Sequence, residues 1–430
     1  MTEAKESKQP RPTPPVRVIT ASSCAAAVPT RPRTTRTAAN DAGSSRGSWA
    51  SVGAVALGAF VVVMTETMPV GLLPQIAQGL DVSLGLAGLM VLVPGLGAAV
   101  SAPLFFLGSG RFNRRSVILV LGVTVLVSNA AVAVAPNFAL VLVARLLLGA
   151  TIGAFWTVVS PVGPRLVGPA NGTRAITIIA AGISGGTVVG LPAGQFLGEL
   201  FGWRLAFATA AAATLLVVVA QAILLPSIPP DGGTHMRDLV ETVSHRAVQF
   251  GMAAGAVVFI GQFAAWTYIT PFLTDYTHLS SGAITLLFVI YGCGGIVGSL
   301  LAGALFRRGV IASFIGSTVV VSALVIGLAL SGTTAWLAVL LLTLWGLVWG
   351  IVNPSTLVWL LDAAPENQEA VSALNVTNLQ VALAIGSALG AILVSTTTLP
   401  TVFLTAGFTI LAAAVVAGVA SQLVTLRRRR

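Results

Sequence analysis

Charged side chains are scarce in this 430-residue sequence: 8% of the residues are Asp, Glu, Lys or Arg, whereas 56% are hydrophobic. This balance excludes an ordinary soluble protein, in which about a quarter of the residues carry charge. Histidine and cysteine are also sparse. His235, His245 and His278 fall in loops without metal-ligand spacing, and Cys24 and Cys293 are the only cysteines. The sequence therefore predicts neither a metal site nor a disulfide framework.

Motifs for nucleotide chemistry and catalysis are missing as well. No GxxxxGK[ST] phosphate-binding loop occurs, and no cluster of nucleophile, acid and base is visible. We therefore expect that the chain is not an enzyme, that it binds no cofactor, and that it does not by itself drive transport with ATP.

Long apolar runs are abundant. A helix needs about 20 apolar residues to cross a hydrocarbon core about 30 Å thick, and twelve windows of this kind recur along the chain. The sequence thus predicts an all-α polytopic membrane protein with twelve transmembrane helices. We place them near Ala50–Leu73, Leu84–Leu107, Val117–Ala135, Phe138–Ser160, Ala175–Leu197, Trp203–Leu225, Ala247–Phe272, Gly282–Leu305, Val310–Leu330, Ala335–Leu360, Ala370–Val394 and Leu399–Val424.

The net charge of +10 follows the loops between these spans. With the N-terminus in the cytoplasm, 21 of the 23 Lys and Arg residues fall on the cytoplasmic side; Arg204 lies outside and Arg145 within a span. The positive-inside rule therefore predicts that both termini are cytoplasmic. It also explains the basic charge as membrane topology, so we predict contact with the lipid bilayer and no nucleic-acid partner.

Composition divides the chain into five parts. Residues 1–47 are rich in Pro, Thr, Ser and Arg and are predicted to be a disordered basic cytoplasmic arm. A six-helix bundle is expected at 48–225, a cytoplasmic linker with turn signals at 226–246, a second six-helix bundle at 247–426, and a basic tail at 427–430.

The two bundles resemble each other in sequence. An offset of 197 residues matches Gly149 with Gly346 and Gly153 with Gly350, and an offset of 200 matches Gly186 and Gly190 with Gly386 and Gly390. These matches favour two pseudo-symmetric halves that arose from one six-helix unit. Repeats of this kind bind substrate between the halves near the bilayer midplane and transport it by alternating access.

One acidic and one basic residue lie away from the ends of the predicted spans of the first half. Glu66 and Arg145 are each about seven residues from the outer end of their span, roughly 10 Å deep. An arginine at this depth costs roughly 2.5–3.5 kcal/mol, so such residues usually serve function. We predict that both line one cavity, with Glu66 binding a coupling proton and Arg145 tuning it. The alternative is a static pair that only orients helices.

Milder polar and aromatic groups supply the candidates for a substrate cavity. Aromatic residues in membrane helices also serve as packing or interfacial anchors, so these candidates are weaker than the charged pair. They are Trp156, Gln262, Trp266, Tyr268, Asn353 and Asn378.

Several motifs carry a resemblance to a known family over about Ser48 to Leu426. The segment VARLLLGATIGAFW, with Arg145, resembles the span-four arginine motif of the drug:proton antiporter-1 group, the twelve-span exporters of the major facilitator superfamily. The segment GGTVVGLPAG is similar to that group's span-five antiporter motif through Gly186, Gly190, Pro192 and Gly194.

Further segments resemble the same group. FGWRLAF is typical of the start of span six, and TETMPVGLLPQIA and FIGQFAAWTYITPF resemble purine ribonucleoside exporters. The loop FFLGSGRFNRRSV keeps the basic pair Arg114 and Arg115 but has Gly110 where the group has aspartate.

The resemblance implies the major facilitator fold and a monomeric, proton-coupled exporter of small organic molecules such as drugs, nucleosides or sugars in the plasma membrane. An importer or uniporter with the same fold remains an alternative, as does a transport-dead membrane sensor. The motifs leave the substrate open.

Overall fold

The computed structural model describes residues 38–108, 112–168, 171–229 and 236–428, and within these ranges the chain is helical without strands. The elements in chain order are α1 Ala38–Gly79, α2 Leu84–Ala87, α3 Leu89–Gly108, α4 Arg114–Ala133, α5 Phe138–Val167, α6 Gly172–Phe201, α7 Trp203–Leu224, α8 Met236–Ser244, α9 Arg246–Trp266, α10 Ile269–Pro271, the π-helical η3 Phe272–Tyr276, α11 Ser281–Phe306, α12 Val310–Ser331, α13 Ala335–Ala363, the 3₁₀ turn η4 Pro365–Asn367, α14 Gln368–Thr396 and α15 Leu399–Arg428.

Twelve of these helices are long and apolar enough to cross a membrane, which confirms the predicted number of spans. They are α1, α3, α4, α5, α6, α7, α9, α11, α12, α13, α14 and α15. The chain is thus a multi-pass membrane protein. Side-chain caps start several of the helices: Asn137 accepts a hydrogen bond from the backbone N–H of Leu140 at 3.0 Å and begins α5.

The ends of the predicted parts fall partly outside the described residues. For the arm predicted at 1–47, residues 1–37 lie outside, and α1 already begins at Ala38. The linker predicted at 226–246 contains the short helix α8, and its residues 230–235 lie outside the described ranges, as do 429–430 of the predicted tail.

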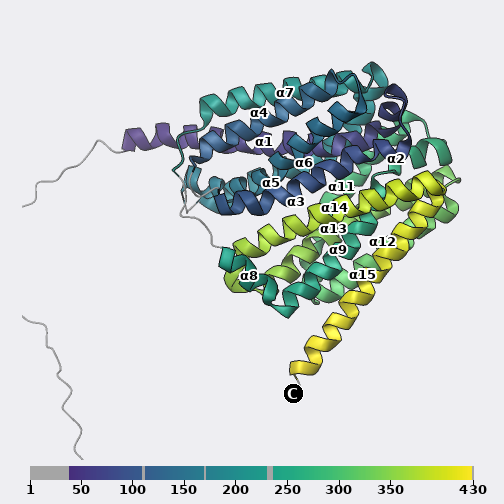
Figure 1. The fold of residues 1–430 in the computed structure, drawn as a ribbon. Coiled ribbons are helices and arrows are strands. Elements are labelled where there is room, and N and C mark those ends of the chain that lie inside the picture. Colours follow the sequence, from purple (N-terminus) through teal and green to yellow (C-terminus); the bar gives the residue numbers. More distant parts are fainter. Residues whose placement is uncertain (1–37, 109–111, 169–170, 230–235, 429–430) are drawn as a thin grey trace, which may run out of the picture. The chain divides into compact units, whose positions relative to one another are not determined.

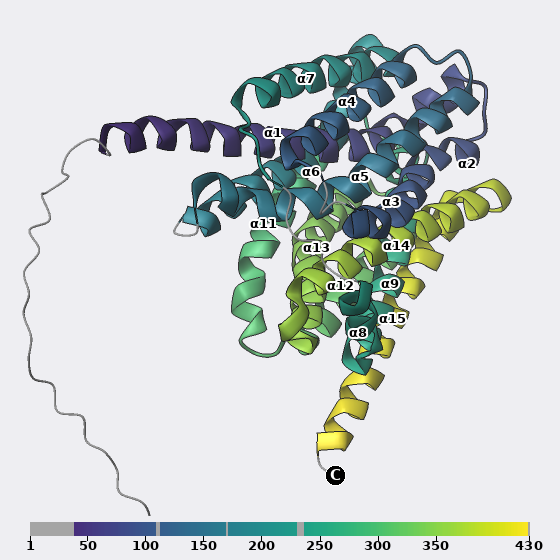
Figure 2. The ribbon, with the colours of Figure 1, turned by 60° about the vertical axis from the view of Figure 1, so that its left-hand side comes forward.

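Two groups of helices make up Ser44–Arg430 (Figures 1 and 2). In the first group α3 packs on α5 and α4 packs on both α5 and α7; in the second, α11 packs on α13, α12 on α13 and α15, and α9 on α14 and α15. The groups meet where α14 packs against α3 and α6 against α11. These are the two six-helix halves.

Close helix contacts at glycine recur in both halves. A Cβ atom on Gly149 would meet the backbone carbonyl of Pro94, and one on Gly346 would meet the carbonyl of Tyr291. Both residues of the second contact lie 197 positions after those of the first. The same offset relates the close contact of Gly153 with Ala98 to that of Gly350 with Gly295. An offset of 200 relates the contact of Gly186 with Phe60 to that of Gly386 with Ile260. The repeat predicted from matched glycines is therefore a repeat of helix contacts.

The glycines of the span-five motif bring α6 against α1. A Cβ atom would meet a backbone carbonyl of α1 at each of three glycines: Phe60 at Gly186, Met64 at Gly190 and Met68 at Gly194. Residues four apart on α6 thus contact residues four apart on α1. Small residues at this spacing allow backbones to approach closely in a membrane. The motif thereby fixes the part of α1 that carries Glu66.

We expect Gly190→Ala to destabilise the protein by about 1–3 kcal/mol, because the added methyl group would meet Thr67 and the Met64 carbonyl. Gly316→Ala is the matched control, since a Cβ atom there meets nothing within 4 Å. Thermal unfolding of both variants in detergent measures the difference; equal midpoints would show that the α1–α6 contact tolerates a methyl group.

Candidate functional site

Arg145 lies in α5 and is fully buried. Its Nη2 donates to the backbone carbonyl of Thr65 on α1 at 3.0 Å, and its Nε donates to the carbonyl of Met90 on α3 at 3.4 Å. The guanidinium also lies 5.6 Å from the ring centroid of Phe207 on α7. Arg145 therefore joins three neighbouring helices of the first half through α5.

Two prolines explain why these carbonyls accept from Arg145. In a helix, the carbonyl of one residue normally accepts from the N–H four residues later, and proline has no N–H. Pro69 stands four residues after Thr65 and Pro94 four residues after Met90, and both prolines lie inside helices. A carbonyl without a donor at membrane depth is costly, so the guanidinium satisfies both.

Glu66 lies next to Thr65 in the same turn of α1 and is half-buried. Glu66 therefore lies close to Arg145, which bonds to the carbonyl of the preceding residue, and a shared role in proton coupling stays a prediction. The predicted arrangement is wrong in one respect: Arg145 is enclosed and bonded to backbone carbonyls, whereas the Glu66 carboxylate accepts from Gln380 on α14 at 3.1 Å. Glu66 therefore faces the second half.

A second polar group lies in the second half and contains no charge. Gln262 on α9 donates to the hydroxyl of Tyr291 at 3.2 Å, and its Oε1 accepts from the indole N–H of Trp345 at 2.9 Å. Trp266 stacks on Tyr291 with ring centroids 4.3 Å apart and meets Trp345 edge-on at 5.9 Å. The structure thus joins two predicted cavity residues, Gln262 and Trp266, with two aromatics from α11 and α13.

The other predicted cavity residues are scattered. Tyr268 is buried between Gly88 and Gly390. Asn378 donates to the carbonyl of Met252 at 3.0 Å and holds α14 to α9. Asn353 is exposed on α13, and Trp156 is half-buried on α5 against Phe155. One common cavity lined by all six is therefore not what the structure shows. A role for each in substrate binding stays a prediction.

The basic pair at the start of α4 contacts the end of α7 and the segment that follows it. The backbone N–H of Arg114 donates to the carbonyl of Ile228 at 3.0 Å, and Nη2 of Arg115 donates to the carbonyl of Ala222 at 2.8 Å. Asn113 adds a bond to Ser227 at 2.6 Å. These contacts join the first half to the start of the linker and do not reach the second half. Gly110 lies outside the described residues.

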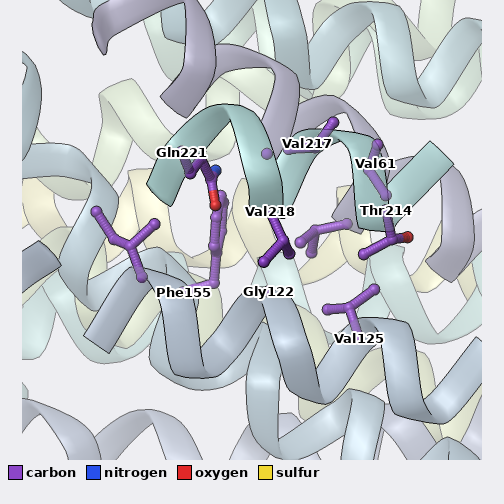
Figure 3. Close-up of a pocket in the computed structure, with 11 residues that line it drawn as sticks. Val61, Gly122, Val125, Phe155, Thr214, Val217, Val218 and Gln221 are labelled. Atoms are coloured by element: carbon purple, nitrogen blue, oxygen red, sulfur yellow. The ribbon is translucent and has the colours of Figure 1, made fainter. Parts of the chain in front are cut away.

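Two cavities lie away from these residues. One, of about 20 Å³, lies between α1, α4, α5 and α7 and has Gln221 and Thr214 as its polar lining (Figure 3). The other, about 520 Å³, is a groove of small and apolar residues from α1, α6 and α7 that includes Gly53, Phe60 and Gly182. Neither is lined by a residue predicted for proton coupling or substrate binding.

Three residues of the two polar groups were missed as site residues in the sequence. The sequence does not distinguish Gln380 from the other isolated amides of the apolar helices, and Tyr291 and Trp345 are two aromatics among many in such helices. The partners of Arg145 did leave a signal, since Pro69 and Pro94 mark the two carbonyls that need a donor.

Comparison with known proteins adds a family and named relatives. The family model described as Major Facilitator Superfamily matches residues 55–387 and 252–423. Among curated proteins, the transcription regulatory protein OpdE of Pseudomonas aeruginosa is 32% identical over 360 residues, 83% of this chain and 89% of its own. The purine ribonucleoside efflux pump NepI of Shigella sonnei is 30% identical over 347 residues, 80% of this chain and 87% of its own.

Solved structures share the fold at lower sequence identity. The crystal structure of the human organic anion transporter MFSD10 aligns with a TM-score of 0.63 at 18% identity, covering 86% of this chain and 99% of that one. A likeness at this identity concerns the arrangement of the helices, and it agrees with the two halves described above.

Proposed function

This chain belongs to the major facilitator superfamily, and on that premise we propose that it is a secondary active transporter that exports small organic molecules across the plasma membrane in exchange for protons. Glu66 takes up a proton from the outside, the two halves rock, and release of the proton inward drives substrate outward. Both termini face the cytoplasm, and the protein works as a monomer.

The position of Glu66 is the observation that carries this proposal. It is a half-buried carboxylate inside a membrane-spanning helix, its nearest side-chain partner comes from the other half, and Arg145 supplies a fixed positive charge close by. A carboxylate that exchanges a proton as the halves move needs access from a cavity and a partner that changes with conformation. Arg145 is fully buried and bonded within the first half, so its positive charge stays beside Glu66 when the second half moves.

The relatives guide the choice of cargo. The name of the Shigella relative, a purine ribonucleoside efflux pump, favours export and a substrate with a planar base. The neutral group around Trp266 suits such a molecule, because an aromatic ring stacks on planar bases and carries no charge that would repel them. We therefore propose a neutral nucleoside or a similarly flat, polar compound as the first substrate to test.

The test is proton release by the purified protein when nucleosides, sugars and antibiotics are added one at a time. A substrate that displaces protons from the parent protein but not from Glu66→Gln would identify the cargo class and the coupling residue together. Flux into or out of proteoliposomes under an imposed pH gradient then gives the direction, and uptake along the proton gradient would point instead to an importer.

Trp266→Ala should weaken binding of an accepted substrate by about tenfold, since loss of one stacking partner costs about 1–3 kcal/mol. Trp336→Ala is the control: this tryptophan is exposed near the start of α13, far along the helix from Trp345. Isothermal titration of both variants with the same substrate makes the comparison. Unchanged affinity in Trp266→Ala would place the substrate elsewhere.

A second candidate function is a membrane sensor that binds a solute without transporting it. The name of the Pseudomonas relative, a transcription regulatory protein, favours this reading. Substrate flux catalysed by purified protein in liposomes separates the two functions, because a sensor would bind the solute and leave its distribution unchanged.

A further inference from the structure

We propose that Gln380 is the positioning residue that links the protonation of Glu66 to the contact between the two halves. The inference rests on the proposed proton coupling at Glu66 and assigns the group that makes this coupling depend on conformation. Its basis is the hydrogen bond from Gln380 Nε2 to Glu66 Oε1, which joins α14 of one half to α1 of the other.

Gln380 is held firmly in this position. Its side chain is 2% exposed, and the α14 backbone at this level lies against α3, where a Cβ atom on Gly95 would meet the carbonyl of Gln380 and the side chain of Leu383. From here the contact between the halves continues toward the ends of α1 and α14. Thr270 donates to the carbonyl of Val70 at 2.8 Å, and Gly85 lies against Ser395.

The amide of Gln380 discriminates between the two protonation states of Glu66. Its Nε2 donates a hydrogen bond to Oε1 of the Glu66 carboxylate at 3.1 Å. A hydrogen bond to an ionised acceptor is roughly twice as strong as a neutral one. The contact therefore stabilises ionised Glu66 as long as the halves are together at α3 and α14.

Separation of the halves removes this donor. Gln380 moves with α14, whereas Glu66 and Arg145 belong to the same half and stay together. The carboxylate then loses a hydrogen bond that favoured its ionised form. By linkage, protonation of Glu66 must favour the separated state to the same extent. This relation suits an exporter, because α1 and α14 separate at the ends that are predicted to face the outside. Glu66 would then take up its proton from that side.

Other charged groups do not change with this movement. Arg145 on α5 is the charged residue that acts on Glu66 from its own half. Helices α2 and α3 contain no Asp, Glu, Lys, Arg or His, and on α4, α6, α9 and α14 such residues stand only near the helix ends. The tyrosines of the other half bond or pack elsewhere: Tyr291 accepts from Gln262, Tyr268 packs at Gly88, and Tyr276 packs against Phe272. Gln380 is thus the group at the carboxylate that the opening removes.

The experiment measures the open-to-closed ratio as a function of pH. Spin labels are placed at Gln78→Cys and Thr397→Cys, two exposed positions at the ends of α1 and α14, after Cys24→Ser and Cys293→Ser, and their distance distribution is recorded between about pH 5 and about pH 8. In the parent background we expect the separated population to rise about tenfold relative to the closed one as the pH falls.

Gln380→Met should reduce this pH-dependent change to less than about twofold, because the side chain keeps its volume and loses the N–H donor. Gln380→Glu keeps a polar side chain of the same shape and is the second variant. At about pH 8 its carboxylate would repel Glu66, so the separated population should exceed that of the parent. Thr270→Val is the control: it removes another bond between the halves and should leave the pH dependence intact.

The outcomes separate this inference from the proposed function. A parental pH response in Gln380→Met, together with its loss in Glu66→Gln, would overturn the role of Gln380 and leave Glu66 as the coupling residue. A parental response in Glu66→Gln would overturn both. A response lost in Gln380→Met and kept in Thr270→Val supports the assignment, since a merely structural contact would not distinguish these two variants.

Discussion

Replacing Glu66 with glutamine is expected to abolish efflux driven by a pH gradient, down to the rate of protein-free liposomes. Glutamine has nearly the same shape and can still bond to Gln380, but it cannot take up or release a proton. The driving force would then no longer reach the substrate. Efflux from proteoliposomes with the outside more acidic measures this directly.

Substrate exchange at equal pH on both sides distinguishes lost coupling from lost folding. Exchange should persist in Glu66→Gln, because it needs the halves to rock and needs no net proton movement. Glu199→Gln is the matched control, since Glu199 is an exposed acidic residue near the end of α6. It should retain gradient-driven efflux. Gradient-driven efflux that survives in Glu66→Gln would rule out Glu66 as the proton carrier.

Removal of Arg145 is expected to damage the fold itself. Arg145→Ala leaves the carbonyls of Thr65 and Met90 without donors inside the first half, where neither Pro69 nor Pro94 supplies an N–H. We expect a loss of about 2–5 kcal/mol, because a hydrogen bond to a charged group contributes about 1.5–3 kcal/mol and an unpaired buried carbonyl costs a similar amount. Thermal unfolding in detergent measures the loss.

A compensating substitution tests the reason for that instability. Pro69→Ala restores a backbone N–H four residues after Thr65, so the helix can satisfy this carbonyl without the guanidinium. In the Arg145→Ala background, Pro69→Ala should therefore recover part of the lost stability. In the parent, the restored N–H competes with Arg145 for the Thr65 carbonyl. If Pro69→Ala changed the unfolding midpoint equally in both backgrounds, the link between proline and arginine would be disproved.

The prolines also show which half of a hydrogen bond the sequence could have predicted. Pro74 follows Val70 by four residues, as Pro69 follows Thr65, and the Val70 carbonyl accepts from Thr270 of the other half. Pro69, Pro74 and Pro94 thus each mark a carbonyl that accepts from a side chain on another helix. The donor itself was not predictable, because Thr270 lies 200 residues away and many hydroxyl groups are candidates.

Gln380 illustrates the opposite limit. Its residue type and its place in an apolar helix are visible in the sequence, yet the bond to Glu66 spans 314 residues and depends on how α14 packs against α3. The neutral group around Gln262 is similar. Trp345 and Tyr291 are two aromatics among many, and only the crossing of α9, α11 and α13 brings them to one amide.

The sequence by itself determined the twelve spans, the repeat of the two halves and the depth of Glu66 and Arg145, because hydrophobic length, glycine spacing and rise per residue are local properties of a helix. The tertiary structure decided which partner each polar group received. In the folded chain Arg145 donates to backbone carbonyls and Glu66 accepts from Gln380. Hydrogen bonds in an apolar interior form only where the packing of distant helices places a donor against an acceptor.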